Sequence, residues 1–310
     1  VSGSGHIGKK TTYLFSVRQS YLQLLFKMIG LPFLPNYIDA QAKVRIRFSQ
    51  RDELTVLALA GIDNMRLNTD EKGEETEYLL SYLPRLRQET FTVGASYRHY
   101  AGRHAQTVTH SYLNNRNTKY LGNDESSEDN LTLRLRAVEQ KTSLRAENRS
   151  HLGRWTLREG VELSYSHYTN RTFRRFFAEQ AGTLNYRTRL GLTGWGAFVA
   201  ADYASADDRL TVSAGIRADG SDFSAETARP WHQLSPRASV RYALSERWTV
   251  AASAGLYYQL PPFTALGLEN GQGERVNRGL KYMRVAETSA GFDWRLRDRL
   301  TVSIEGFHKF

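Results

Sequence analysis

The sequence has 310 residues, of which 40% are hydrophobic and 12% aromatic, and it carries a formal net charge of +10 and no cysteine. The lack of cysteine excludes disulfide frameworks, thiolate catalysis and sulfur-ligated metal sites. No apolar run approaches the roughly 18–20 residues of a membrane-spanning helix. The arginines are spread along the chain rather than gathered in a basic arm. This distribution favours anionic lipid or an anionic ligand over nucleic acid as the binding partner of the positive charge.

One short sequence unit recurs along the chain. It is written DELTV at 52–56, DRLTV at 208–212, ERWTV at 246–250 and DRLTV at 298–302, with looser copies GRHAQTV at 102–108 and GRWTL at 153–157. Each copy joins a charged turn to alternating apolar and polar residues, which predicts a tight hairpin turn followed by a β-strand. Six such turns predict a meander of antiparallel strands.

The first two-faced strand is expected at 38–48. One of its faces carries Ile38, Val44 and Ile46, and the other carries Lys43, Arg45 and Arg47, which would be costly to bury in a packed core. We therefore expect the charged face to meet water and the apolar face to meet lipid. Similar alternation recurs at Phe91–Arg98, Leu131–Ala137, Leu210–Ala218, Ala238–Leu244, Trp248–Tyr258, Ala286–Leu296 and Leu300–Ile304.

The connections alternate between short turns and long loops. Long segments are expected at 20–37, 64–89, 114–130, 169–188, 220–235 and 261–284. Short turns on one side and long loops on the other are typical of outer-membrane barrels. The predicted fold is therefore all-β, a transmembrane antiparallel up-and-down β-barrel.

Two of the long loops contain helical spacing. Leu22, Leu25, Phe26 and Ile29 form one apolar stripe, and a second stripe from Tyr78 to Leu86 is expected to be limited by Pro84.

The strand alternation is disturbed at two places. Glu159 falls on the apolar face of its strand, and the alternation slips by one residue between Leu192 and Trp195. A β-bulge at Gly160 or Gly194 would restore each pattern.

Three stretches carry a resemblance to a known family: RQSYLQLLFKMIGLPFLPNYIDAQAKV at 18–44, LSPRASVRYALSERWTVAASAGLYYQLPPFTALG at 234–267, and the final DRLTVSIEGFHKF. They resemble the barrel of TonB-dependent outer-membrane receptors, and the resemblance covers essentially the whole chain. It implies a barrel of roughly 22 strands with its own plug domain, surrounded by lipid and lipopolysaccharide in a Gram-negative outer membrane. Such receptors import a bulky, scarce nutrient (a ferric siderophore, cobalamin or an oligosaccharide) with energy from a TonB-type complex.

The sequence is expected to be part of such a protein. It begins without a methionine or a signal peptide, and about thirteen strands are predicted, an odd number that would not close a bacterial barrel. Residues 1–310 are therefore interpreted as a partial barrel domain without plug or closing strands, so coupling to the energy-transducing complex would use parts outside this chain. A passive porin-like or structural barrel, and a soluble β-sandwich that binds polyanions, are the alternatives.

The sequence contains no catalytic, cofactor or metal-binding motif: HExxH, GxSxG and a phosphate-binding Gly-rich loop are all missing. The predicted functional residues are instead those of a lumen. Cations expected to face it are Lys43, Arg45, Arg47, Arg134, Arg136, Arg217, Arg237, Arg241 and Arg295. They would either attract an anionic solute or form a salt-bridge ladder that holds the plug. Aromatic and polar candidates for solute contact near the mouth are Trp231, His232, Tyr257, Phe263 and Tyr282.

Overall fold

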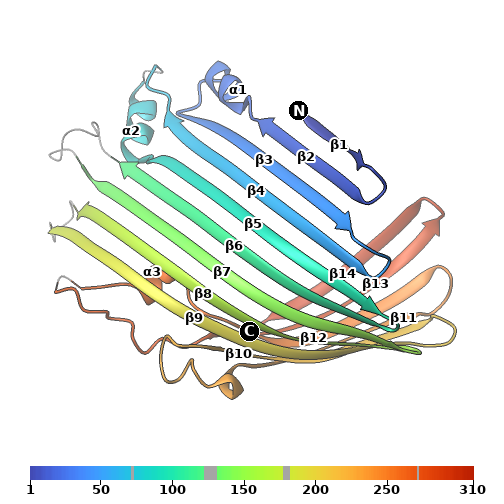
Figure 1. Cartoon of the computed structure of the whole chain (residues 1–310). Coiled ribbons are helices and arrows are strands. Elements are labelled where there is room, and N and C mark those ends of the chain that lie inside the picture. The colour runs from blue at the N-terminus through green and yellow to red at the C-terminus, as the bar shows by residue number, and fades with distance from the viewer. Residues whose placement is uncertain (71–72, 122–130, 177–181, 271) are drawn as a thin grey trace.

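A computed structural model of the chain describes residues 1–70, 73–121, 131–176, 182–270 and 272–310. Its strands form one 14-stranded sheet in which each strand pairs with its sequence neighbours, from β1 at one edge to β14 at the other. Every pairing is antiparallel, and the sheet curves into an open half-cylinder with β1–β9 in front (Figure 1). The predicted all-β up-and-down fold is confirmed.

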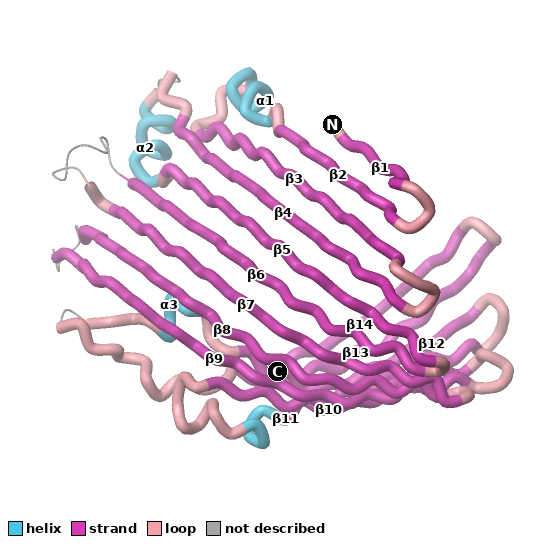
Figure 2. The backbone as a smooth tube through the Cα atoms, in the orientation of Figure 1, coloured by secondary structure: helices cyan, strands magenta, loops and turns pink. Residues whose placement is uncertain are grey.

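The strands are β1 (Ser2–Ile7), β2 (Thr11–Gln19), β3 (Phe33–Arg47), β4 (Asp52–Leu67), β5 (Arg85–Ala101), β6 (His104–Leu121), β7 (Leu133–Leu152), β8 (Trp155–Phe176), β9 (Gly182–Ala204), β10 (Leu210–Ser221), β11 (Leu234–Ala243), β12 (Trp248–Gln259), β13 (Met283–Arg297) and β14 (Leu300–Lys309). The described helices are α1 (Leu22–Met28), α2 (Glu74–Tyr82), α3 (Phe263–Leu266) and the 3-10 helix η1 (Pro230–Gln233), all at the long-loop end of the sheet or on its inside (Figure 2).

The repeated sequence unit marks one rim of the sheet. Its six copies lead into β4, β6, β8, β10, β12 and β14, and every one of these strands starts from a short turn at the same end of the sheet. A seventh short turn, at Gly8, was not predicted. Gly8 has a φ of +63°, a conformation that glycine adopts without a steric penalty, and the hairpin that it closes pairs β2 with one additional strand, β1. The observed 14 strands therefore exceed the predicted count of about thirteen by one.

A helix forms at each of the two predicted helical stripes, but Ile29 and Leu83 lie just beyond the helix ends and Leu86 belongs to β5. Phe26 of α1 packs edge-on against Phe33 at the start of β3, with ring centroids 5.3 Å apart. Helix α2 ends at Tyr82, two residues before Pro84, because proline cannot donate the next backbone hydrogen bond. Among the described residues, no helix has the length and hydrophobicity needed to cross a membrane.

The predicted bulges at Gly160 and Gly194 are wrong. The ladders that join β8 to β7 and to β9 run without a register shift. Glu159 stays on the outer face, where the side-chain amide of Asn148 donates a hydrogen bond to it over 3.0 Å. Leu190 and Leu192 point inward and are almost completely buried, so the strand needs no correction of its alternation. Residues of the loop between β12 and β13 cover them on this side.

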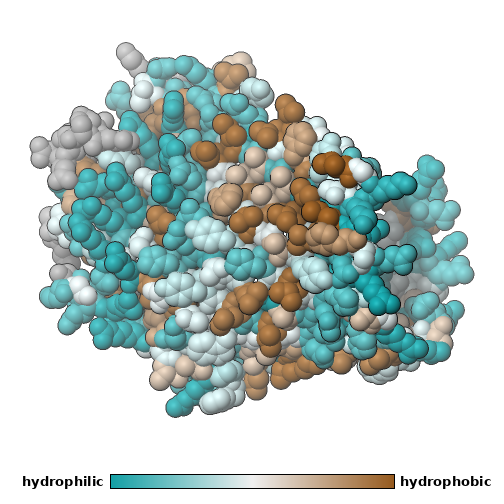
Figure 3. Space-filling view, in the orientation of Figure 1, coloured by the Kyte–Doolittle hydropathy of each residue, from teal (hydrophilic) through white to brown (hydrophobic). Residues whose placement is uncertain are grey.

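The outer face of the sheet carries an apolar band. On β8, Val161, Leu163 and Tyr165 are about half exposed on this face, while the alternate residues Ser166 and Tyr168 are buried on the inside. Figure 3 views the outer face and shows hydrophobic residues gathered over the middle of β3–β8, with hydrophilic residues towards both ends. Such a band with polar margins is the surface that a barrel presents to lipid.

Candidate functional site

The inner face of the sheet can be traced through the register of its strands, because directly opposed residues of an antiparallel pair lie on the same face. One such line of opposed residues crosses seven neighbouring pairs and joins Arg45, Thr55, Ser96, Thr109, Arg145, Glu162, Gly196 and Asp219. The same phase places seven of the nine expected lumen cations on the inner face: Lys43, Arg45, Arg47, Arg217, Arg237, Arg241 and Arg295.

The other two, Arg134 and Arg136, lie on the outer face, which corrects the sequence-based expectation. They alternate along β7 with Leu135 and Ala137, and Ala137 belongs to a buried cluster inside the curve of the sheet. The expectation failed because the alternation of β7 shows which face is apolar but not which face is outside. Here the apolar face is covered from within.

That cover is the loop between β12 and β13, which folds back against the inner wall. The ring of Phe263 stacks on Tyr168 at a centroid distance of 5.6 Å, and Leu266 is fully buried against Ala137 and Leu190. The hydroxyl of Thr188 donates a hydrogen bond to the carbonyl of Gly267. These contacts attach α3 to β7, β8 and β9 and form the largest buried cluster on the inner wall among the described residues.

The same loop is held to itself and to β9 by side-chain donors. The amide of Asn277 donates to the carbonyl of Ala265 over 2.8 Å, and the Arg275 guanidinium donates to the carbonyl of Arg189 over 2.8 Å. The loop therefore has a defined position inside the half-cylinder rather than hanging over its edge (Figure 1).

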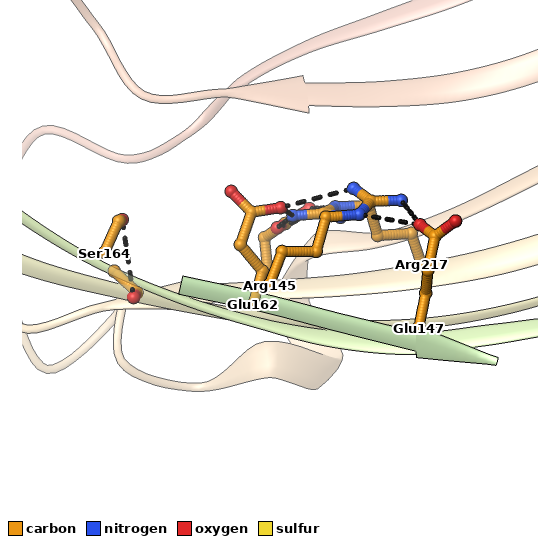
Figure 4. A network of polar contacts seen from close by, with 7 residues as sticks. Arg145, Glu147, Glu162, Ser164 and Arg217 are labelled. Atoms are coloured by element: carbon orange, nitrogen blue, oxygen red, sulfur yellow. Dashed lines mark hydrogen bonds and ion pairs between the residues drawn. The ribbon is translucent and has the colours of Figure 1, made fainter. Parts of the chain in front are cut away.

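Below this loop lies a network of ion pairs that connects β7, β8 and β10 (Figure 4). Glu162 lies between two arginines: its Oε2 is 3.5 Å from Arg145 Nη1 and 3.4 Å from Arg217 Nη2. Arg145 also contacts Glu147 at 3.0 Å, and Arg217 contacts Asp219 at 2.6 Å. Both arginines are thus compensated by carboxylates, and little of their charge is free to attract a solute.

Arg237 differs from these two arginines. Its guanidinium carbon lies 4.3 Å from the centre of the Tyr257 ring, a cation–π arrangement. Among the described residues no carboxylate contacts it, and its side chain lines two neighbouring cavities. Arg237 is therefore a cation of the inner wall that can still accept an anionic group.

The first cavity, of about 510 Å³, lies between the inner wall and the β12–β13 loop. Its floor is formed by β7–β11 and its roof by residues 260–263 together with Tyr282. The lining residues are Glu139, Lys141, Glu162, Ser164, Ser166, Leu192, Gly194, Trp195, Gly196, Arg217, Asp219, Gly220, Arg237, Tyr258, Gln259, Leu260, Pro261, Pro262, Phe263 and Tyr282. Burial raises the pKa of Tyr282 to about 12, so its hydroxyl stays neutral at physiological pH and can donate or accept a hydrogen bond.

The expected solute-contact residues are divided between several places. Phe263 and Tyr282 line the first cavity, and Tyr257 lines the second, of about 430 Å³. Trp231 and His232 lie in η1 and line neither. His232 Nδ1 is instead 3.0 Å from a carboxylate oxygen of Glu226 in the same loop.

Several lining residues were missed in the sequence. Glu139, Lys141 and Arg145 share the inner face of β7, which the apolar residues at 131–137 predict to face lipid, and Glu162 belongs to the strand for which a bulge is predicted. The charged residues Glu139 and Lys141, two positions apart on one face of β7, were a sequence signal that this face meets water. Within the part of the chain that the structure describes, no three His, Asp or Glu side chains are grouped so as to hold a metal ion.

Comparisons with known proteins agree with this architecture. The model of the family "TonB dependent receptor-like, beta-barrel" matches residues 34–309. No curated protein shows significant similarity to the sequence. Similar solved structures include Pseudomonas aeruginosa FpvA in a complex with a ferric pyoverdine, at 14% identity and a TM-score of 0.68 over 99% of this chain and 45% of that one.

Two further similar structures extend this comparison. A variant of the ferric enterobactin receptor PfeA from Pseudomonas aeruginosa has 16% identity and a TM-score of 0.68 over 99% of this chain and 49% of its own. The copper transporter OprC has 12% identity and a TM-score of 0.69 over 97% and 50%. The chain thus spans about half the length of these solved structures, and at such identities the likeness concerns the fold.

Proposed function

This chain belongs to the TonB-dependent receptor-like β-barrel family, and from that membership we propose that its parent protein is a receptor that imports a bulky, scarce nutrient with TonB-derived energy. Members of this family reside in the outer membrane and are transporters rather than enzymes. The observation that carries the proposal is the match of the family model over residues 34–309, nearly the whole sheet. The parent protein would supply the plug domain and the contact with the energy-transducing complex.

The charged inner wall is proposed to hold the plug rather than to attract solute along its whole length. Arg45 pairs with Glu53 at 2.5 Å, and Arg241 pairs with Asp293 at 3.3 Å, as Arg217 does with its two carboxylates. Compensated ion pairs of this kind provide many hydrogen-bonding groups on a water-exposed surface, but they produce no large electrostatic field. This supports the salt-bridge ladder over an open, anion-attracting wall.

The cavity beneath the β12–β13 loop is proposed as a place where the solute contacts the barrel. Its volume is in the range of ligand pockets, and its lining includes the aromatic residues Phe263 and Tyr282 together with the uncompensated cation of Arg237. A solute with aromatic rings and negative charge, such as a ferric siderophore, fits this combination better than a neutral oligosaccharide does. The solved structures in the comparison carry different cargo in their titles, so they support the class of transport and not the cargo.

Uptake assays on the full-length receptor test this function. Cells that produce it should accumulate ⁵⁵Fe from at least one member of a panel of ferric catecholate, hydroxamate and mixed siderophores, and a protonophore or deletion of the TonB complex should abolish accumulation. Radiolabelled cobalamin and maltohexaose are the alternative cargoes. Uptake that continues without the energy supply would contradict the proposal and favour the passive, porin-like alternative.

A further inference from the structure

The outer face of β8 carries one acidic residue within its apolar band. Between Trp155 and Tyr165 the outward-facing side chains are apolar or aromatic except for that of Glu159. These ten residues, at roughly 3.3 Å each and a tilt near 40°, rise by about 25 Å, the height of the apolar band of an outer-membrane barrel. Glu159 follows Trp155 by four positions and therefore lies about 10 Å inside the edge of the band.

Glu159 has no cationic partner within the described part of the chain. Its side chain is exposed, and its hydrogen bond there comes from the amide of Asn148, 3.0 Å from Oε1. A charge on the lipid-facing surface destabilises a barrel, and ionisable groups at membrane depth are rare and mostly paired. The position therefore calls for a partner from outside this sheet.

A histidine stands on the same face, on the other side of β7. His110 of β6 is directly opposite Leu144 of β7, and Leu144 is directly opposite Leu163 of β8. His110 therefore shares the outer face with Glu159. The two strands start from the same rim, and His110 follows the first residue of β6 by six positions. It thus lies only about 5 Å higher than Glu159, the rise of two residues.

The imidazole of His110 has hydrogen-bonding capacity to spare. Its Nε2 is 3.0 Å from the hydroxyl of Thr142, whereas Nδ1 has no hydrogen bond within the described residues. The side chain is exposed, and an imidazole N–H can donate to a carboxylate. Within one chain no contact joins it to Glu159, because β7 lies between their strands.

The strand between these two residues presents a small side chain. Ala146 of β7 is exposed on the outer face, directly opposite Val108 on one side and Val161 on the other. Small residues let two membrane-embedded surfaces approach closely, and polar side chains hydrogen-bond across such contacts. In a twofold contact residue i meets residue j and j meets i, so complementary groups on either side of a small centre fit this symmetry.

We propose that the outer face of β6–β8 binds a second copy of this chain within the membrane. A twofold axis along the membrane normal, passing near Ala146, sets Glu159 of each copy against His110 of the other. Both carboxylates and both imidazoles are then paired, and the surrounding apolar residues of the band (Figure 3) close the contact. The contact leaves the lumen untouched, so it is independent of the cargo.

Cross-linking of the full-length receptor in lipid bilayers tests the contact. These 310 residues contain no cysteine, so Ala146→Cys places a thiol near the proposed axis. Ala60→Cys, on the exposed outer face of β4, is the matched control. Any cysteine elsewhere in the parent protein is first replaced by serine. Oxidation should link the Ala146→Cys protein into dimers and leave the Ala60→Cys protein monomeric. Equal cross-linking of both, or none at position 146, would overturn the proposal.

Exchange of the two polar residues tests their pairing. Glu159→Leu and His110→Leu should each weaken self-association about tenfold, because two equivalent pairs are lost and each contributes roughly a threefold factor. Energy transfer between labelled copies diluted in liposomes measures this. The double variant Glu159→His with His110→Glu should restore association, since the groups pair again across the axis.

Heat-resistant electrophoretic mobility shows that each variant is folded before association is compared. Unchanged association of Glu159→Leu would overturn the proposal. Weaker association of both single variants without recovery in the folded double variant would do so too, by assigning the two residues to another membrane protein.

Discussion

Arg217 and Asp219, two residues apart on the inner face of β10, form a side-by-side ion pair in which the Arg217 Nε lies 2.9 Å from both carboxylate oxygens. This arrangement depends on Gly196, which stands directly opposite Asp219 on β9. A Cβ atom at Gly196 would lie 2.6 Å from Asp219 Oδ1 and 2.7 Å from Arg217 Nη2. The missing side chain of the glycine therefore makes room for the ion pair.

Gly196→Ala should displace this pair and lower the free energy of unfolding by about 1 kcal/mol, the low end of the cost of overpacking, because the ends of flexible side chains can move. Gly61→Ala is the matched control, since Gly61 is also in a strand of this sheet and nothing lies within 4 Å of its added Cβ. Thermal unfolding of the full-length proteins in detergent measures the difference. Equal melting temperatures of the two variants would contradict the close fit at Gly196.

Arg217→Gln and Arg237→Gln should have different effects, although both remove one cation from the first cavity. Loss of Arg217 leaves Glu162 and Asp219 with less compensation, so we expect a lower unfolding temperature. Loss of Arg237 breaks no contact with a carboxylate in the described structure, only the contact with the Tyr257 ring. The unfolding temperature should therefore stay nearly the same. The expected effect of this loss is weaker uptake of an anionic cargo with unchanged uptake of a neutral one.

This comparison requires a panel of at least one anionic and one neutral cargo for the same receptor. If Arg237→Gln reduced the uptake of both to the same extent, Arg237 would serve plug contact instead of solute binding.

Leu266→Ala should release the β12–β13 loop from the inner wall. The side chain is fully buried, and truncation of a buried leucine typically costs about 2–5 kcal/mol. Because the cost falls on the attachment of one loop, we expect faster limited proteolysis within 260–282 rather than global unfolding. Val276→Ala in the same loop is the control, because Val276 is 53% exposed. Identical cleavage rates for both variants would show that the cluster does not hold the loop.

The contact of Glu226 with His232 and Lys281 should depend on pH. A hydrogen bond from His232, with the nearby charge of Lys281, lowers the pKa of Glu226. Because the pKa of Glu226 is lower in the folded loop, the unfolded loop binds the proton more tightly. The contact therefore stabilises the folded loop fully above the usual glutamate pKa of about 4.3. This stabilisation is lost as the pH falls through the lower pKa of the folded loop. Hydrogen-exchange protection in 222–233 should therefore be kept at pH 7 and decline below about pH 4.

Glu226→Gln should remove this dependence by lowering protection already at pH 7. Glu269→Gln provides the control, since no ion pair of Glu269 is found within the described residues. If acid reduced the hydrogen-exchange protection of 222–233 equally in the Glu226→Gln protein and in the unmodified protein, another group would be the cause of the pH effect.

Much of the fold follows from local signals in the sequence. The charged turns, the alternation that follows them and the stripes of α1 and α2 are each encoded within about ten residues, and the structure confirms them. The Gly8 turn was missed because its sequence, GKKTT at 8–12, does not match the repeated unit of the other turns.

The site was less predictable because it depends on contacts between distant segments. Ala137, Tyr168 and Leu190 face inward by register and are buried there in one cluster with Leu266, which comes from a distant loop. An alternating pattern identifies the apolar face of a strand, but the side on which lipid lies is decided by what packs there. This is why Arg134 and Arg136 were assigned to the lumen and why Glu139 and Lys141 were not considered.

The strands of this wall differ greatly in height. β9 has 23 residues and β11 has 10, which at a tilt near 45° correspond to rises of about 54 Å and about 23 Å. Since all of them start from the same rim, the opposite edge of this sheet is cut obliquely and is highest over β7–β9. Insertions in the loops of β10–β12 would therefore level this edge, whereas insertions between β8 and β9 would raise its higher side further.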